Sequence, residues 1–142
     1  MSTNSAIFIE KDGKIKGIYC HWDGNLEGVG RTLLEHYQNE DKVLRLIELG
    51  NISGLGSELG EKHDFNSNEH TDWTHAYHRD RGDNWEQSKP FEAMTYIEAK
   101  EFFKEACCSY FYIFRNGLWF VDFTDKNKSG PVLLSEALEE IS

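Results

Sequence analysis

Cysteines, basic side chains and long apolar runs are all scarce in this chain of 142 residues. Its three cysteines are Cys20, Cys107 and Cys108, and an odd number with two neighbours predicts reduced thiols rather than a disulfide framework. No apolar run approaches the roughly 18 residues needed to cross a bilayer. The first residues lack a basic segment followed by an apolar one, so we expect no signal peptide and a cytoplasmic protein.

The charge balance is strongly negative. Lys and Arg together number 15 and Asp and Glu 25, which gives a formal net charge of −10. A surface of this sign repels phosphate backbones and anionic lipids, so direct binding to nucleic acid or to a membrane is not expected. It suits docking onto a basic partner, including a nucleic-acid-binding protein with a positive groove. The simpler alternative is that the charge only keeps a small domain in solution.

Hairpin signals occur near both ends of the chain. Each consists of two β-prone runs around a turn dipeptide: residues 6–9 and 15–22 around Asp12-Gly13, and residues 109–115 and 118–123 around Asn116-Gly117. Both dipeptides favour the two-residue turns that join antiparallel strands. A short strand is also expected where Trp73, His75 and Tyr77 alternate with smaller residues, followed by a charged loop over residues 79–90.

Helical periodicity separates these hairpins. Val29, Leu33, Leu34 and Tyr37 fall on one helical face, and residues 41–49 predict a second helix with Gly50 as its left-handed cap. Thr95 begins a capping box, so a third helix should follow, with Ile97, Phe102, Phe103 and Ala106 as its buried face. A last helix is expected over residues 135–141, with Ser135 as its N-cap. We therefore predict one globular domain (residues 1–142) of α+β class, with an antiparallel sheet of about five strands. Three to four helices should cover one face of that sheet.

The stretch from Cys20 to Gly24 is the first candidate site. It places a thiol, an imidazole, an indole and a carboxylate at Cys20, His21, Trp22 and Asp23. Adjacent strand residues point to opposite faces, so Cys20 and His21 cannot easily bind one metal ion, and we predict no metal site. A single buried cysteine is more often a small core residue than a nucleophile.

A glycine-spaced turn follows this stretch. The pattern from Gly24 to Gly30, then Arg31-Thr32, resembles a phosphate-binding loop, but it has five residues between its glycines instead of four, and Arg instead of Lys. A nucleotide triphosphatase is therefore not expected. Backbone amides near Gly28 and Gly30, together with Arg31, could still hold an anion at the start of the helix. Alternatively, the glycines only permit a sharp corner between strand and helix.

The second candidate site is the segment Tyr77-His78-Arg79-Asp80-Arg81-Gly82. Arg79 and Arg81 form a basic island in an acidic region, and guanidinium groups suit carboxylate or phosphate partners. Pairing with neighbouring carboxylates such as Asp80 and Asp83 is the structural alternative. Histidines also gather between residues 63 and 78, either as a cluster or as ordinary surface residues: His63, His70, His75 and His78.

Several blocks taken together resemble a family of short proteins from bacteriophages, prophages and mobile elements. They are YCHWDG (residues 19–24), LLEHY (33–37), LG-x-I-S-x-LG (49–56), AYHRDRG (76–82) and the aromatic hairpin with Asn116-Gly117. The resemblance covers nearly the whole chain and implies no enzymatic activity. It does imply an accessory protein made in the cytoplasm of a bacterial host.

This resemblance, together with the charge, predicts a non-enzymatic binding module. It would inhibit a bacterial defence system, as an anti-CRISPR or another anti-defence protein, by occupying a basic surface of a host protein. The expected contact residues come from both candidate sites: His21, Trp22, Asp23, Gly28, Gly30, Arg31, His78, Arg79, Asp80 and Arg81. No cofactor is expected.

Three alternatives stay open. The protein could sequester a nucleotide immune signal, with Arg79 and Arg81 on phosphate and Trp73 and Trp85 stacked on the base. It could be a small hydrolase that uses Cys20, His21, Asp23 and His78, which must then converge on one pocket. It could also form homo-oligomers through the edge of the aromatic hairpin.

Overall fold

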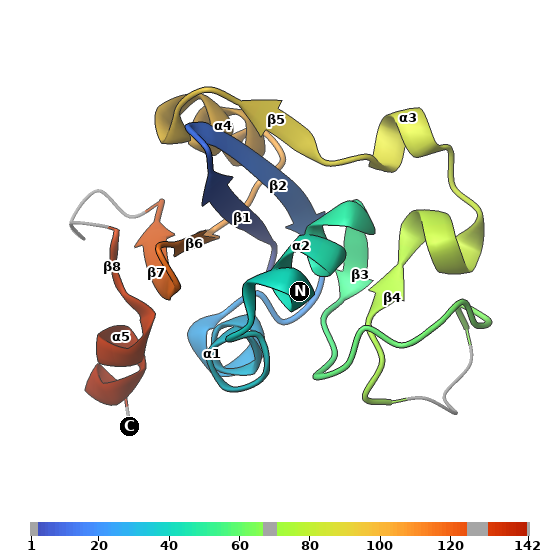
Figure 1. Ribbon diagram of the computed structural model, residues 1–142. Helices are drawn as coiled ribbons and strands as arrows, with labels where there is room; N and C mark the ends of the chain where they lie inside the picture. Colours follow the sequence, from blue (N-terminus) through green and yellow to red (C-terminus); the bar gives the residue numbers. More distant parts are fainter. Residues whose placement is uncertain (1–2, 67–70, 125–130, 142) are drawn as a thin grey trace.

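In the computed structural model, which describes residues 3–66, 71–124 and 131–141, eight strands form one mixed sheet (Figure 1). The strands are β1 (Ser5–Lys11), β2 (Lys14–Cys20), β3 (Ile52–Gly54), β4 (His75–Ala76), β5 (Phe91–Ala93), β6 (Tyr110–Arg115), β7 (Leu118–Phe123) and β8 (Val132–Leu133). Their order across the sheet is β4-β3-β2-β1-β6-β7-β8, and β5 pairs with the first half of β2. The α+β class is confirmed.

Five α-helices and two single-turn π-helices complete the described part of the chain. The α-helices are α1 (Arg31–His36), α2 (Glu40–Glu48), α3 (Trp85–Ser88), α4 (Tyr96–Lys104) and α5 (Leu134–Glu140); the π-helices are η1 (Leu26–Gly30) and η2 (Tyr77–Arg81). Residues 79–90, expected as a loop, therefore contain the end of η2 and all of α3. The N-cap of α5 is Leu133 rather than the expected Ser135.

Both hairpins are confirmed. Asp12-Gly13 joins β1 to β2 and Asn116-Gly117 joins β6 to β7, and all four turn residues have the positive φ angles of a type I′ turn. The purely antiparallel five-stranded sheet is wrong, because β1 pairs in parallel with β6 and β2 pairs in parallel with β3.

The expectation that all helices lie on one face is also wrong. Ile7 and Ile9 of β1 face a core under α1, α2 and α5, whereas Ala6 and Phe8 face a second core under α4. A strand that is covered on both sides has an uninterrupted apolar run, as residues 6–9 do, rather than an alternating one.

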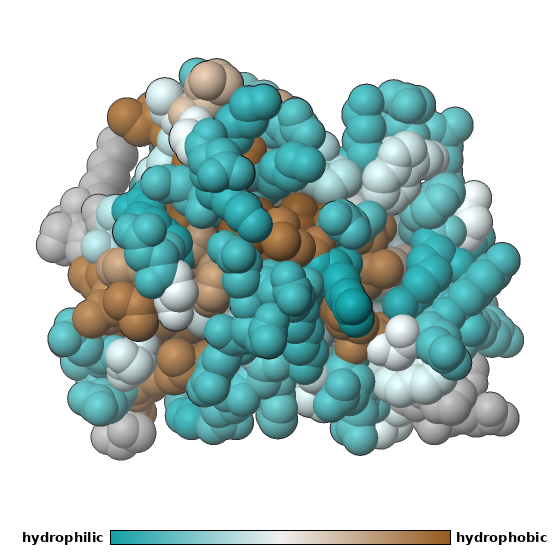
Figure 2. Space-filling model, in the orientation of Figure 1, coloured by the Kyte–Doolittle hydropathy of each residue, from teal (hydrophilic) through white to brown (hydrophobic). Residues whose placement is uncertain are grey.

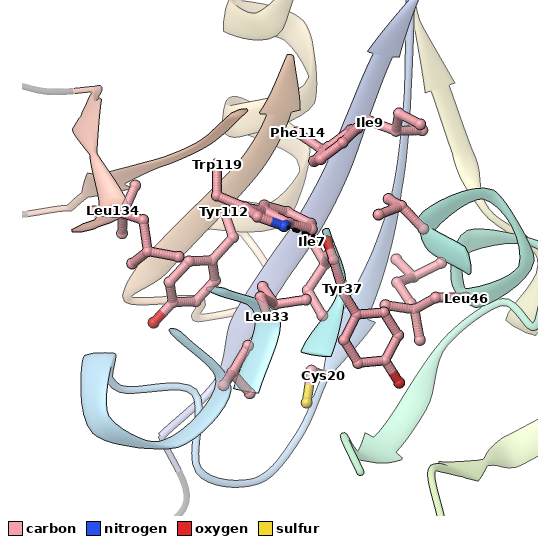
Figure 3. Close-up of a cluster of buried hydrophobic side chains, with 14 of the residues drawn as sticks. Ile7, Ile9, Cys20, Leu33, Tyr37, Leu46, Tyr112, Phe114, Trp119 and Leu134 are labelled. Atoms are coloured by element: carbon pink, nitrogen blue, oxygen red, sulfur yellow. Dashed lines mark hydrogen bonds between the residues drawn. The ribbon is translucent and has the colours of Figure 1, made fainter. Parts of the chain in front are cut away.

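Aromatic and aliphatic side chains fill the larger core (Figure 3). Tyr37 is fully buried there; its hydroxyl donates to the carbonyl of Gly56 (2.7 Å), and its own carbonyl accepts from Trp119 Nε1 (2.8 Å). Tyr112, also fully buried, donates its hydroxyl to the carbonyl of Gly24 (2.7 Å). These two tyrosines connect α1 and the glycine turn to the sheet, and both of their buried hydroxyls have a hydrogen-bond partner.

Helix α4 covers the opposite face with fewer residues than expected. The Thr95 hydroxyl caps it by accepting from the Glu98 amide, as the capping box predicts. Ala99 and Phe103 are buried, but Ile97 is 73% exposed and Phe102 48% exposed. Ala106 is also exposed and follows the end of the helix, so the predicted buried face is wrong at these three positions. Among the described residues, no helix is both long and apolar enough to cross a membrane.

Candidate functional site

The sheet brings the two candidate segments of the sequence side by side. Strand β3 lies between β2 and β4, pairing Ile52 with Cys20 on one side and with Ala76 on the other. Cys20 ends β2 and Ala76 ends β4, so the YCHWDG and AYHRDRG blocks lie on either side of β3 in this part of the sheet. The surface there is hollowed.

Two adjoining depressions form the hollow, which we name the Tyr19 groove. The smaller has a volume of about 310 Å³ and is lined by Tyr19, Asn51, Tyr77, Arg81, Asp83, Gln87 and Ser88. The larger has a volume of about 450 Å³ and is lined by Tyr19, Asn51, Glu86, Gln87, Lys89, Pro90, Phe91, Phe102, Phe103 and Ala106. Volumes of this size are typical of ligand-binding hollows.

Asn51 fixes the floor of the groove. Its side-chain oxygen accepts from the Tyr19 amide (2.9 Å), its backbone amide donates to the Ser88 carbonyl (2.7 Å), and its carbonyl accepts from the Tyr77 amide (3.2 Å). The close approach of α3 depends on Gly50, which has a φ of +80° as the expected left-handed cap of α2. A Cβ atom there would lie 2.3 Å from the Ser88 carbonyl oxygen.

Aromatic faces form the walls. Phe91 and Phe102 stack in parallel with their ring centroids 4.0 Å apart, although they come from β5 and α4. The Tyr19 hydroxyl bonds to His21 Nδ1 at 2.9 Å, and burial is the main cause that raises the pKa of Tyr19 to about 12. The phenol is therefore a neutral hydrogen-bonding group at physiological pH.

Cys20 and His21 lie on opposite faces of β2, as the alternation predicts. Cys20 is fully buried in the larger core, and burial raises the pKa of its thiol to about 12. His21 instead contacts Tyr19 and packs edge-on against Trp22, which is 49% exposed. Asp23 is exposed with a φ of +55°. A thiol in this position cannot be activated by the neighbouring imidazole.

The glycine turn uses its own backbone amides. The amides of Gly28 and Gly30 donate to the Asn25 carbonyl, and the Gly28 Cα lies so close to Asp23 that a Cβ atom would lie 2.2 Å from its carbonyl oxygen. Arg31 pairs with Glu27 and Glu35 on the helix surface. This geometry favours the sharp corner over an anion-binding site.

Arg79 and Asp80 face inward. The buried Asp80 carboxylate accepts from Arg79 Nε (2.9 Å), from the Ala76 amide (2.8 Å) and from the His63 amide (3.2 Å). The Arg79 guanidinium also donates to the carbonyls of Thr74 and Gly60. Burial acts to raise the pKa of Asp80, but these hydrogen bonds outweigh it and hold the pKa below its ordinary value.

Arg81 faces the groove but is already paired. Its guanidinium donates two hydrogen bonds to Asp83 (2.8 and 2.7 Å) and lies over the Tyr77 ring at 4.6 Å. His78 Nδ1 bonds to the Asp83 carbonyl, and its ring contacts Trp85. The two arginines of the basic island therefore have opposite surroundings, one inside the fold and one at the groove.

Two of the four gathered histidines meet. His63 Nε2 and His75 Nδ1 lie 2.9 Å apart, while His78 has different neighbours and His70 lies outside the described residues. Burial, followed by the proximity of His63, lowers the pKa of His75. No group of three or more candidate metal ligands occurs within residues 3–66, 71–124 and 131–141.

Several groove residues carried no functional signal in the sequence. Tyr19 and Tyr77 belong to recognisable blocks, but Asn51 and Gln87 are ordinary loop and helix residues. The sequence pattern predicts Phe102 as a core residue, and only its stacking on Phe91 in the structure shows that it lines the groove. Comparison of the chain with protein-family models, curated proteins and solved structures finds no match.

Proposed function

We propose that this protein is a non-enzymatic binding module of the bacteriophage or mobile-element type, which inhibits a bacterial defence system by occupying a basic surface of a host protein. The YCHWDG and HRDRG blocks support the phage context. The proposed binding to a basic surface is supported by the pairing of the charged side chains: most cations of the described residues are paired within the chain, whereas several exposed carboxylates there are not.

The basic side chains are largely neutralised by the chain itself. Arg31, Arg79, Arg81 and Arg115 each pair with a carboxylate, and Lys42 donates to two backbone carbonyls. Several exposed carboxylates have no cationic partner in the described part of the chain: Asp41, Glu48, Glu58, Glu105, Glu136 and Glu140. Figure 2 shows a largely hydrophilic surface on the side of α1 and α2. Such a surface attracts a basic partner and speeds its association.

A hydrolase is disfavoured by the positions of its expected groups. Cys20 lies in the core with a raised pKa, on the face of β2 opposite His21. His78 bonds to a backbone carbonyl and Trp85, and no contact joins it to Cys20, His21 or Asp23 in the described residues. A nucleophile and its base need direct contact, or contact through one water.

A nucleotide sponge is disfavoured by the state of its arginines. Phosphate binding requires guanidinium donors that are available, but Arg79 donates inward and Arg81 is paired with Asp83. Trp73 is half-buried against His63 rather than presented for stacking. Binding to a basic protein surface, in contrast, requires neither a free arginine nor a stacking tryptophan.

Plating efficiency tests the proposal. Bacteria that carry a defence system should plate a sensitive phage with higher efficiency when they express the protein, and purified defence protein should bind it with an affinity that falls with salt. Asp41→Lys with Glu48→Lys should weaken this binding, whereas Lys14→Glu, which makes the exposed surface more acidic, should not weaken it. Unchanged plating across a panel of defence systems, with no binding to their components, would refute the proposed function.

A further inference from the structure

We infer that the Tyr19 groove is the docking site of this module and that its occupant is a tyrosine or tryptophan side chain of the partner protein, flanked by basic residues. This inference rests on the proposed function and names the chemistry of the contact. It follows from the shape of the groove, from its walls and from the charges around it.

The walls suit a planar ring. The stacked pair of Phe91 and Phe102 leaves Phe102 48% exposed at the mouth of the larger depression, and Tyr19 continues the aromatic surface toward Tyr77. An exposed aromatic face beside a hollow of about 450 Å³ can take a further ring by stacking or edge contact. Aromatic anchors seated in such hollows dominate the energetics of many protein interfaces.

The polar groups suit a ring with one hydrogen-bonding atom. Asn51 and Gln87 line both depressions, so amide groups lie at the junction of the groove. A phenol hydroxyl or an indole N–H could bond there while the ring stays against the phenylalanines. A purely aliphatic side chain would leave these amides without that partner.

The charges disfavour a phosphate-bearing occupant. The cations that line the groove are Lys89 and Arg81, and each is held by a carboxylate that lines it too: Glu86 at 2.8 Å and Asp83 at 2.7 Å. The hollow therefore presents no unpaired cation for a nucleotide. Beyond its rim, exposed Glu105 adjoins Ala106 and adds negative charge, which complements basic residues on either side of the inserted ring.

A peptide titration tests the inference without the host protein. We would titrate ¹⁵N-labelled protein with acetyl-Lys-Tyr-Lys-amide and follow its amide resonances. Those of Tyr19, Asn51, Gln87 and Phe102 should shift and saturate. Acetyl-Lys-Ala-Lys-amide has the same charge but no ring, and it should bind at least about tenfold more weakly, since an aromatic contact of this kind is worth roughly 1.4 kcal/mol.

Matched variants of α4 sharpen the test. Phe102→Ala should weaken binding of the tyrosine peptide about tenfold, whereas Ile97→Ala, at a more exposed position of the same helix, should leave it unchanged. Thermal melting confirms that both variants fold, and Gln87→Ala provides a second groove variant at an exposed position. Equal binding of the two peptides, or shifts confined to α5, would overturn the inference.

Adenosine monophosphate is the probe for the competing occupant. Tighter binding of this nucleotide than of the tyrosine peptide at the same residues would also overturn the inference. Failure here is distinguishable from failure of the proposed function. If the peptide binds saturably but phage plating is unchanged, the proposed function is refuted and the groove remains a binding site. If plating rises but no peptide site is found, the proposed function is supported and the inference about the groove is refuted.

Discussion

The pairing of Arg79 with Asp80 predicts a large loss of stability when the carboxylate is removed. In Asp80→Ala the guanidinium keeps its two carbonyl partners but loses its counter-charge, and the buried amide of Ala76 loses its acceptor. Removing one partner of a buried ion pair costs about 3–5 kcal/mol. Because the Arg79 side chain is still 17% exposed, water can partly replace the carboxylate, and we expect the lower end, about 3 kcal/mol.

The isosteric variant separates charge from hydrogen bonding. Asp80→Asn keeps one oxygen that can accept from Ala76 or His63 and loses the charge, so we expect a cost of about 1–2 kcal/mol. For a chain of this length each kcal/mol lowers the melting temperature by about 3 °C, which makes Asp80→Ala melt about 10 °C below the parent protein.

Urea denaturation followed by tryptophan fluorescence measures both variants. Asp83→Ala is the matched control, because it removes a carboxylate from the same segment but from an exposed pair that water screens, and it should change stability little. If Asp80→Ala unfolded at the parent urea concentration while partner binding was lost, the carboxylate would be a contact residue and its structural role would be refuted.

Four further substitutions should each have a measurable effect on stability. Tyr37→Phe removes a buried hydroxyl that donates to a backbone carbonyl, and it should cost about 1–2 kcal/mol in urea denaturation. In Gly60→Ala, a residue with a φ of +71° gains a Cβ atom 2.4 Å from the Trp73 ring, which should cost about 2–3 kcal/mol by the same assay. Gly13→Ala has a similar φ but nothing within 4 Å, and it should cost about 1 kcal/mol. Burial, followed by the neighbouring histidine, lowers the pKa of His75 in the fold, so the unfolded chain takes up its proton first. Stability should therefore decline as the pH falls through about 6.5, and His75→Gln should remove that decline in melts recorded across this range.

Local signals account for the parts of the fold that the sequence predicted well. Asp12-Gly13 and Asn116-Gly117 are dipeptides whose own conformational preferences produce a two-residue turn, so both hairpins could be read without knowing their neighbours. The same is true of Gly50, which ends α2, and of Thr95, which begins α4. In each case the determining interaction spans a few residues.

The parallel pairing in the sheet has no such signal. Strand β1 lies beside β6 although about a hundred residues separate them, and β3 pairs with the end of β2 over only a few residues, at Ile52 and Cys20. Helical periodicity also gave the wrong buried face for α4: Ile97 and Phe102 are as apolar as Phe103, and only packing against β1 determines which side is buried. Tertiary contacts override propensity at these positions.

The candidate sites show the same division. Alternation along β2 predicted that Cys20 and His21 would diverge, and they do. In contrast, no pattern distinguishes Arg79 from Arg81, since each lies directly beside Asp80 in the sequence. The difference arises because the Asp80 carboxylate turns inward to accept from the amide of Ala76, and Arg79 turns with it.

This inward turn has a consequence for where recognition can occur. Arg79 and Asp80 of the HRDRG block hold the loop before β4 against η2, so their hydrogen-bonding groups are already used within the fold. The groove walls at Phe91, Phe102 and Gln87 come from other segments. If the Tyr19 groove is the docking site, substitutions in those walls should change partner binding without changing the scaffold. Substitutions at Arg79 or Asp80 would instead change the stability of the loop, and partner choice only as a result.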